Sequence, residues 1–240
     1  MLNNLKLDEV LFLDIETVPQ YPVYSDMPDS LKKFWDKKSE YMKKDLDTPE
    51  SLYSRAGIFA EFGKIICISA GVIVQRDGNK YFRVKSFFGD DEKILLQGFA
   101  QMLKRFEVKQ NSNICAHNGK EFDFPFIARR MLVHGIDLPE MLNVAGKKPW
   151  DVKFLDTMEL WKFGDYKSFT SLDLLTQIFN IPSPKDDIDG SQVADVYYKQ
   201  NDLNRIVHYC EKDALTVAQL LLRYRNEEII KPENLERVLE

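Results

Sequence analysis

The chain has 240 residues, of which 44% are hydrophobic and 30% are charged, so it can bury a sizeable core, and this composition excludes disorder and collagen-like repeats. Its 33 basic and 38 acidic residues give a net charge of -5, which argues against unspecific coating of duplex nucleic acid as its main activity. The longest apolar stretch, residues 65–74, is shorter than the roughly 20 residues of a membrane-spanning helix, and the N-terminal residues lack a signal-peptide pattern. We therefore expect a cytoplasmic protein without a membrane segment.

The first part of the chain predicts strands separated by a long insertion. Residues 10–13 are a continuous apolar run, which predicts a buried central strand. Residues 64–74 and 80–88 are rich in strand-favouring side chains, and the turn residues 77–79 between them predict a hairpin. Residues 19–62 separate the first strand from the hairpin by more than a usual loop, so we expect a helical insertion there.

The rest of the chain predicts alternating helices and strands. In chain order these are a helix from Asp90 or Asp91 to Phe106, a short strand at 113–117, a helix at 122–134, a weaker strand at 152–155, and helices at 157–161, 171–179 and 202–224. This order is typical of an α/β protein with helices on both faces of a mixed sheet. We expect five strands in a single domain spanning residues 1–240. The acidic segment 184–190 is interpreted as a turn whose role is left open.

Two acidic residues end the first predicted strand. Side chains two apart in a strand point the same way, so Asp14 and Glu16 can face one spot. Carboxylate oxygens are the ligands that Mg²⁺ and Mn²⁺ prefer, and ends of buried strands are common positions for catalytic groups in α/β sheets. Considered alone, this pair is also typical of solvated loop acids.

Three further polar residues follow buried elements. Asp123 comes after a short strand at the start of a helix, where helix capping alone would account for it. Tyr209 and Asp213 are four apart in the last predicted helix, so they share one face. An acid beside the apolar stripe of that helix is unfavourable unless it is paired or bound to a cation, which favours a functional role for Asp213.

Together these segments resemble the DEDD superfamily of 3′-5′ exonucleases. The matching motifs are Leu13-Asp14-Ile15-Glu16-Thr17, Asn118-x-x-x-Phe122-Asp123 and Tyr209-x-x-x-Asp213. They are most similar to the DEDDy subgroup, which includes the proofreading domain of family-B DNA polymerases and stand-alone bacterial exonucleases. The resemblance extends from residue 14 to about residue 224 and implies the ribonuclease-H-like fold, a mixed sheet flanked by helices.

The resemblance implies a mechanism as well as a fold. It implies that two divalent cations, Mg²⁺ or Mn²⁺, are held by four carboxylates, and that Tyr209 orients the attacking water. The four are Asp14, Glu16, Asp123 and Asp213. The expected activity is metal-dependent removal of nucleotides from the 3′ end of a single strand, with DNA favoured as the substrate and the protein partners unknown.

The resemblance also suggests substrate contacts. Thr17 and Val18 occupy positions where the family meets the terminal nucleotide, and Phe122 is expected to shape that pocket. Asn118 is expected either to contact the substrate or to turn the loop. In the insertion, lysines lie among aromatic residues, which predicts either binding of a single nucleic-acid strand by charge and stacking or a solvated helical face. These residues are Lys32, Lys33, Lys37, Lys38, Lys43 and Lys44 with Phe34, Trp35 and Tyr41.

Several alternatives remain open at the level of sequence. His208 also has the spacing of a histidine subgroup, but on a helix it lies about 140° from Asp213, whereas Tyr209 lies about 40° away, which favours tyrosine. His117 and His134 lack nearby metal-ligand partners, so we expect strand-end packing and a solvated helix face for them. A 3′-5′ exoribonuclease and a non-catalytic nucleic-acid-binding module are the alternative functions.

Overall fold

The computed structural model describes residues 2–108, 111–182 and 188–238, so the segment 184–190 lies largely outside the described residues. Its centre is one mixed sheet with the strand order β5-β4-β1-β2-β3-β6. The strands are β1 Val10–Pro19, β2 Gly63–Arg76, β3 Asn79–Phe88, β4 Asn113–Ala116, β5 Phe154–Asp156 and β6 Leu235–Arg237. β1 pairs antiparallel with β2 and parallel with β4, so it lies inside the sheet, as its apolar run predicts.

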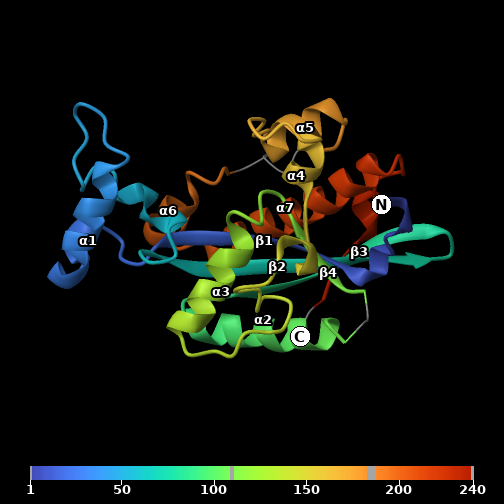
Figure 1. Cartoon of the computed structure of the whole chain (residues 1–240), viewed down its shortest axis with the longest axis horizontal. Coiled ribbons are helices and arrows are strands. Elements are labelled where there is room, and N and C mark those ends of the chain that lie inside the picture. The colour runs from blue at the N-terminus through green and yellow to red at the C-terminus, as the bar shows by residue number, and fades with distance from the viewer. Residues whose placement is uncertain (1, 109–110, 183–187, 239–240) are drawn as a thin grey trace.

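Helices cover both faces of this sheet, which gives the ribonuclease-H-like arrangement (Figure 1). The α-helices among the described residues are α1 Asp29–Glu40, α2 Glu92–Phe106, α3 Asp123–Val133, α4 Thr157–Lys162, α5 Leu172–Ile178, the short α6 Val193–Asp195, and α7 Leu203–Tyr224. α2 and α3 cover one face, while α7 crosses the other and contacts α4 and α5. Among the described residues, no helix has both the length and the apolar character required to cross a membrane.

The expected number of strands is corrected from five to six. The additional strand, β6, has three residues and pairs parallel with β3 through Phe82, Arg83 and Val84. A strand of three residues is too short to show an alternating pattern. Its pairing with β3 joins Phe82 to Leu235, far away in sequence, so local sequence carries no signal for it.

Short-range signals explain where several elements begin. The carboxylate of Asp91 accepts a hydrogen bond from the backbone N–H of Ile94 at 3.1 Å and caps α2, one of the two caps expected. Asp77 and Gly78 have φ angles of 48° and 75°, the left-handed backbone that the hairpin between β2 and β3 requires. The predicted hairpin and α2 are confirmed.

The alternation of side chains along β1 decides which face carries the acidic residues. Leu11 and Leu13 pack in the core on the α2 and α3 side, whereas Val10 and Phe12 pack against α7. Asp14 continues the series of Val10 and Phe12, so it points to the α7 side of the sheet. The same alternation brings Glu16 to that side before the register shift that follows it.

The segment between β1 and β2 contains one regular helix and its own small core. α1 ends at Glu40, and turns with a short 3-10 helix at Tyr53–Ile58 lead back to β2. Trp35 of α1 is fully buried, and its indole N–H donates to the carbonyl of Pro49 at 2.7 Å. Of the aromatic side chains expected to contact a single strand, Trp35 is therefore committed to packing, while Phe34 and Tyr41 are exposed.

His134 does not lie on a solvated face as expected. Its Nε2 lies 2.7 Å from a carboxylate oxygen of Glu92, which also accepts from the guanidinium of Arg130 at 2.6 Å. Glu92 and Arg130 are both buried, so this pair joins α2 to α3 inside the molecule. The partner of His134 is 42 positions away in sequence, and no local pattern reveals it.

Candidate active site

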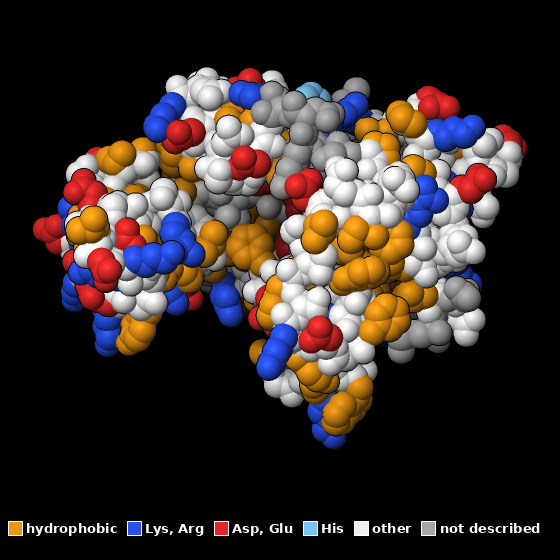
Figure 2. Space-filling view, turned by 90° about the horizontal axis from the view of Figure 1, so that it is seen from above, with side chains coloured by type: hydrophobic (Ala, Val, Ile, Leu, Met, Phe, Trp, Pro, Cys, Tyr) orange, Lys and Arg blue, Asp and Glu red, His pale blue; other side chains and the backbone are white. Residues whose placement is uncertain are grey.

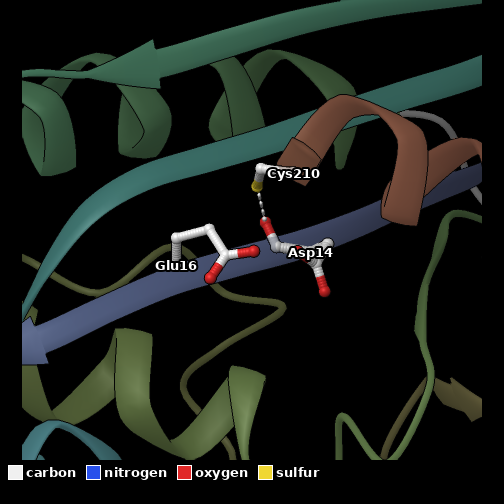
Figure 3. Close-up of side chains that lie close together, drawn as sticks. All are labelled: Asp14, Glu16 and Cys210. Carbon is white, nitrogen blue, oxygen red and sulfur yellow. Dashed lines mark hydrogen bonds between the residues drawn. The ribbon is translucent and has the colours of Figure 1, made fainter. Parts of the chain in front are cut away.

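β1, α7 and the start of α3 bring the predicted acids close to Asp14. Asp14 and Glu16 project from β1, and α7 lies across this strand (Figure 3). Asp213 lies on α7, and Asp123 begins α3 directly after the turn that follows β4. Because β1 and β4 are parallel neighbours, the residues at their carboxyl ends are brought to the same edge of the sheet.

The electrostatics of these acids reflect their proximity. Burial raises the pKa of Asp14 well above its usual range, and repulsion by Glu16, Asp213 and Asp123 raises it further. Burial likewise raises the pKa of Glu16, with repulsion by Asp213 as the next cause. Like charges gathered in a buried place are unfavourable unless something neutralises them, so the site favours either protons or cations.

Asp123 is the acid whose pKa moves into the neutral range. Burial raises its pKa to about 7, and the negative charge of Asp156 contributes, although backbone N–H groups of Asp123 and Ile15 oppose the shift by stabilising the charged form. Asp123 is buried in the first turn of α3, whose N-cap is Phe122. Asp123 is therefore the first residue of α3 and not its N-cap.

The donor set fits a hard divalent cation. Atom Oδ2 of Asp14 is buried without a hydrogen-bond partner among the described residues, which is costly for a carboxylate oxygen unless a cation binds it. Ligand atoms of Asp14, Glu16 and Cys210 all lie within 4.8 Å of one another. Oxygen ligands from carboxylates are what Mg²⁺ and Mn²⁺ require.

Cys210 is a neighbour of this site that the sequence motifs did not identify. Its thiol donates to the backbone carbonyl of Asp14 at 3.3 Å, as the dashed line in Figure 3 shows. Burial raises the pKa of Cys210 well above its usual range, so the group is a protonated thiol. A thiol suits softer metals than Mg²⁺, and we assign Cys210 to holding α7 against β1. Cys210 directly follows Tyr209 in the sequence, and this position inside the motif is the sequence signal that could have identified it.

Tyr209 lies beside the acids and His208 points elsewhere. Burial raises the pKa of Tyr209, and the negative charge of Asp213 adds to the shift; the two side chains are also hydrogen-bonded. The side chain of His208 is 61% exposed, and its Nδ1 lies 3.5 Å from a carboxylate oxygen of Glu211. α7 already begins at Leu203, so both residues lie on regular helix and the helical angles expected from the sequence apply.

The four expected substrate contacts have different surroundings. Thr17 is half-buried at the register shift of β1, and Val18 is fully buried in a cluster that includes Tyr209. Asn118 is half-buried with a φ of 60°, which is the turn-forming role expected for it as one of two alternatives. Phe122 is half-buried and packs on Phe126, with ring centroids 5.5 Å apart.

Asp156 is a second residue that sequence reasoning missed. It is only 2% exposed and ends β5, beside the turn that leads to Asp123. Its carboxylate accepts from the backbone N–H groups of Asn118 at 3.0 Å and Lys120 at 3.1 Å, and it also caps α4 through Met158 at 2.9 Å. Asp156 thus fixes the turn between β4 and Asp123. An acid ending a strand just before a helix is the sequence signal that could have identified it.

The pKa of Asp123 gives a prediction for stability against pH. Its folded value of about 7 exceeds the ordinary aspartate value of about 3.9, so the folded state keeps a proton that the unfolded state releases. We therefore expect this carboxyl to make the metal-free protein less stable as the pH rises from about 4 to about 7. Mg²⁺ or Mn²⁺ should reverse this loss, because bound cations favour the ionised carboxylate.

Thermal unfolding at stepped pH, with chelator or with Mg²⁺, measures this effect. The control is Asp123→Asn, which lacks the titrating group but keeps every other acid. One of these is Glu92: burial acts to raise its pKa, but the hydrogen bond from Arg130 opposes burial, and the pKa is lowered. The stability of the wild type relative to this variant should fall with rising pH. A constant difference would show that Asp123 does not titrate in this range.

Comparison with known proteins provides one finding that covers most of the chain. A profile of the family described as predicted 3′-5′ exonucleases related to the exonuclease domain of PolB matches residues 58–235. The matched part includes Asp123, Tyr209 and Asp213 and begins after β1, which carries Asp14 and Glu16. No protein with a curated description matches the chain.

Proposed function

Since the chain belongs to the family of predicted 3′-5′ exonucleases related to the exonuclease domain of PolB, we propose that it removes nucleotides from the 3′ end of single-stranded DNA by cation-dependent hydrolysis. The observation that carries this proposal is the convergence of the acids around Asp14. Its unpartnered oxygen Oδ2 lies among carboxylates whose mutual repulsion a divalent cation would relieve.

The metal-binding roles follow from the positions of the acids. Asp14, Glu16, Asp123 and Asp213 would hold two divalent cations, Mg²⁺ or Mn²⁺. When bound, such cations activate a water for attack on the phosphodiester and stabilise negative charge on the leaving 3′ oxygen. Asp123 must be ionised to take part, so its raised pKa links cation binding to proton release.

Tyr209 and the turn after β4 position groups that take part in the proposed reaction. We assign the hydroxyl of Tyr209, which is hydrogen-bonded to Asp213, to orienting the attacking water. Asp156 holds the turn before Asp123, and the carboxylate of Asp123 contacts the backbone N–H of Ile15 in β1. Thr17 at the register shift and Phe122 at the start of α3 remain our candidates for contacts to the terminal nucleotide.

A polyanionic substrate is supported by the surface beside Tyr209. A cavity of about 560 Å³ adjoins this residue, and cationic side chains predominate among its charged lining groups. The lining comprises Ile188, Asp202, Asn204, Arg205, His208, Tyr209, Lys212 and Arg237. Cations at this place attract phosphates toward a site whose own acids would be neutralised by metal. The relation to the exonuclease domain of a DNA polymerase favours DNA over RNA.

The proposed activity predicts a direction of degradation. With Mg²⁺ or Mn²⁺, we expect mononucleotides to be released stepwise from the 3′ end of single strands with little sequence preference. Strands labelled at the 5′ end should yield a ladder of shortened products, and strands labelled at the 3′ end should lose the label at once. A phosphate on the 3′ hydroxyl should inhibit, and chelator should stop the reaction.

The controls separate the competing functions. Circular single strands should resist degradation, because they offer no terminus, and their cutting at a comparable rate would contradict the proposal. Faster degradation of RNA than of DNA of the same sequence would indicate an exoribonuclease. Binding of single strands without hydrolysis under any divalent cation would indicate a non-catalytic module.

A further inference from the structure

A short loop after α4 exposes three aromatic side chains to solvent. The aromatic loop comprises residues 162–169, which are Lys162, the last residue of α4, and the segment that leads from it toward α5. Phe163, Tyr166 and Phe169 are 91%, 86% and 69% exposed, and none of them belongs to the hydrophobic clusters among the described residues. Large apolar groups held in water are unfavourable, so three of them within seven residues point to a binding partner.

The aromatic loop also carries cationic groups. Nζ of Lys162 lies 4.2 Å from the centroid of the Phe169 ring, and Lys167 adds a second cation. The one acid of the loop, Asp165, is engaged within it, since its carboxylate accepts from the N–H of Lys167 at 3.1 Å. Lysines for phosphates and aromatic faces for bases are the combination that binds single-stranded nucleic acid without sequence preference.

The backbone at Phe163 is in a conformation that favours glycine. Its φ of 44° and ψ of 34° lie in the left-handed region, which is rare for a bulky side chain. Gly164, with a φ of 91°, continues the reversal of the chain. A phenylalanine in this conformation whose ring contacts solvent contributes strain and no core packing, so its presence favours a binding role over a folding role.

A hydrogen bond connects the residue after the aromatic loop to the segment that precedes Asp123. Nε2 of His117 lies 3.0 Å from the carbonyl oxygen of Thr170, the residue after the loop, and Nδ1 of His117 lies 2.9 Å from the hydroxyl of Thr157. His117 directly follows β4 and precedes the turn to Asp123. The loop is thus attached to the segment that delivers Asp123.

The surface view is consistent with this placement. Figure 2 looks onto the side of the molecule where α4 and α5 project in Figure 1, and hydrophobic side chains gather there with Lys or Arg beside a hollow. A single-stranded nucleic acid whose 3′ end lies at the acids has to cross the neighbouring protein surface as it leaves the candidate active site. An aromatic and cationic loop attached to the turn before Asp123 is suitably placed to bind it.

We propose that the aromatic loop stacks bases of single-stranded nucleic acid that lie upstream of its two 3′-terminal nucleotides. This inference rests on the proposed exonuclease function and adds the surface that holds the strand. The charge of the lysines selects a polyanion over an uncharged apolar partner, and the planar side chains suit unpaired bases. A second copy of this chain is the competing occupant, and the experiment below distinguishes the two.

The test compares a long and a short substrate. We expect Tyr166→Ala and Phe163→Gly each to lower kcat/KM on an oligothymidylate by about tenfold, the usual effect of losing one stacked base, and to leave hydrolysis of a thymidine dinucleotide unchanged. Phe163→Gly should unfold at the same or a higher temperature than the wild type, because glycine adopts the left-handed backbone without strain. The matched control is Trp150→Ala, which should behave as wild type on both substrates.

Trp150 is a suitable control because, like the rings of the aromatic loop, it is exposed and close to a lysine, but it lies elsewhere in the fold. It is 77% exposed and has Nζ of Lys148 5.4 Å from its ring centroid, but it precedes the start of β5, whereas α4 and the aromatic loop follow its end. Binding of a labelled oligothymidylate, measured in an Asp14→Ala background so that the strand is not consumed, should weaken for the loop variants and not for Trp150→Ala.

Three results would overturn the inference. Equal kcat/KM values for wild type and loop variants on the long substrate would show that no base stacks there. Conversion of a dimer to a monomer by Tyr166→Ala, with strand binding unchanged, would assign the loop to self-association. Loss of thermal stability in Phe163→Gly would assign the ring to folding. A wild type that hydrolyses neither substrate would contradict the proposed function instead, and strand binding would then be judged by itself.

Discussion

Asp14→Ala is expected to abolish nucleotide release while making the metal-free protein more stable. Its carboxylate lies among the other acids of the site, with Oδ2 unpartnered, so its removal should eliminate cation binding and relieve repulsion. Loss of the cation chemistry should lower kcat by about a thousandfold or more, which corresponds to about 4 kcal/mol of transition-state stabilisation. Without metal, the unfolding temperature should rise by about 2 °C or more.

Asp213→Ala should show the same loss of activity, because its charge acts on both Asp14 and Glu16. The matched control is Asp137→Ala, which removes an exposed acid beyond the end of α3 and should leave both activity and stability unchanged. Circular dichroism verifies that each variant is folded, and calorimetric titration with Mn²⁺ measures cation binding. Full activity of either site variant at saturating metal would contradict the assignment of the four carboxylates.

Tyr209→Phe should lower kcat by about a hundredfold without a matching loss of cation affinity. The ring would still fill its buried position, but the hydroxyl next to Asp213 would be gone, and positioned proton-transfer groups typically contribute a factor of this size or more. Cation affinity should change little, because the carboxylates remain. Steady-state kinetics and Mn²⁺ titration of the same preparation separate these two quantities.

His208→Ala is the comparison that decides between the two overlapping motifs. His208 is largely exposed and faces Glu211, so its removal should have a much smaller effect than the loss of the Tyr209 hydroxyl. A histidine acting as base would also give the rate a pKa near about 6.5, whereas orientation by tyrosine would not. The pH profile has to be recorded at saturating metal, so that titration of Asp123 does not enter. A nearly inactive His208→Ala beside an active Tyr209→Phe would reverse the assignment.

Much of the fold could be predicted because its signals are local. The apolar run at 10–13, the turn at Asp77 and Gly78, and the capping residue Asp91 each act within a few residues of where they stand, and β1, the hairpin and α2 follow from them. The spacing of Asp14 from Glu16, and of Tyr209 from Asp213, likewise fixes which of these side chains share a face of one element. Such periodicities need no knowledge of the rest of the molecule.

Only the tertiary structure determined which distant segments these elements contact. β6 pairs with β3, His134 binds Glu92, and Asp156 holds the turn at Asn118, each through partners far away in sequence. The same holds for the exposed rings of the aromatic loop, since exposure depends on which surfaces the rest of the chain leaves uncovered. Backbone geometry sets local periodicity, whereas contacts between distant segments depend on how all the apolar faces are buried together, and that depends on the whole chain.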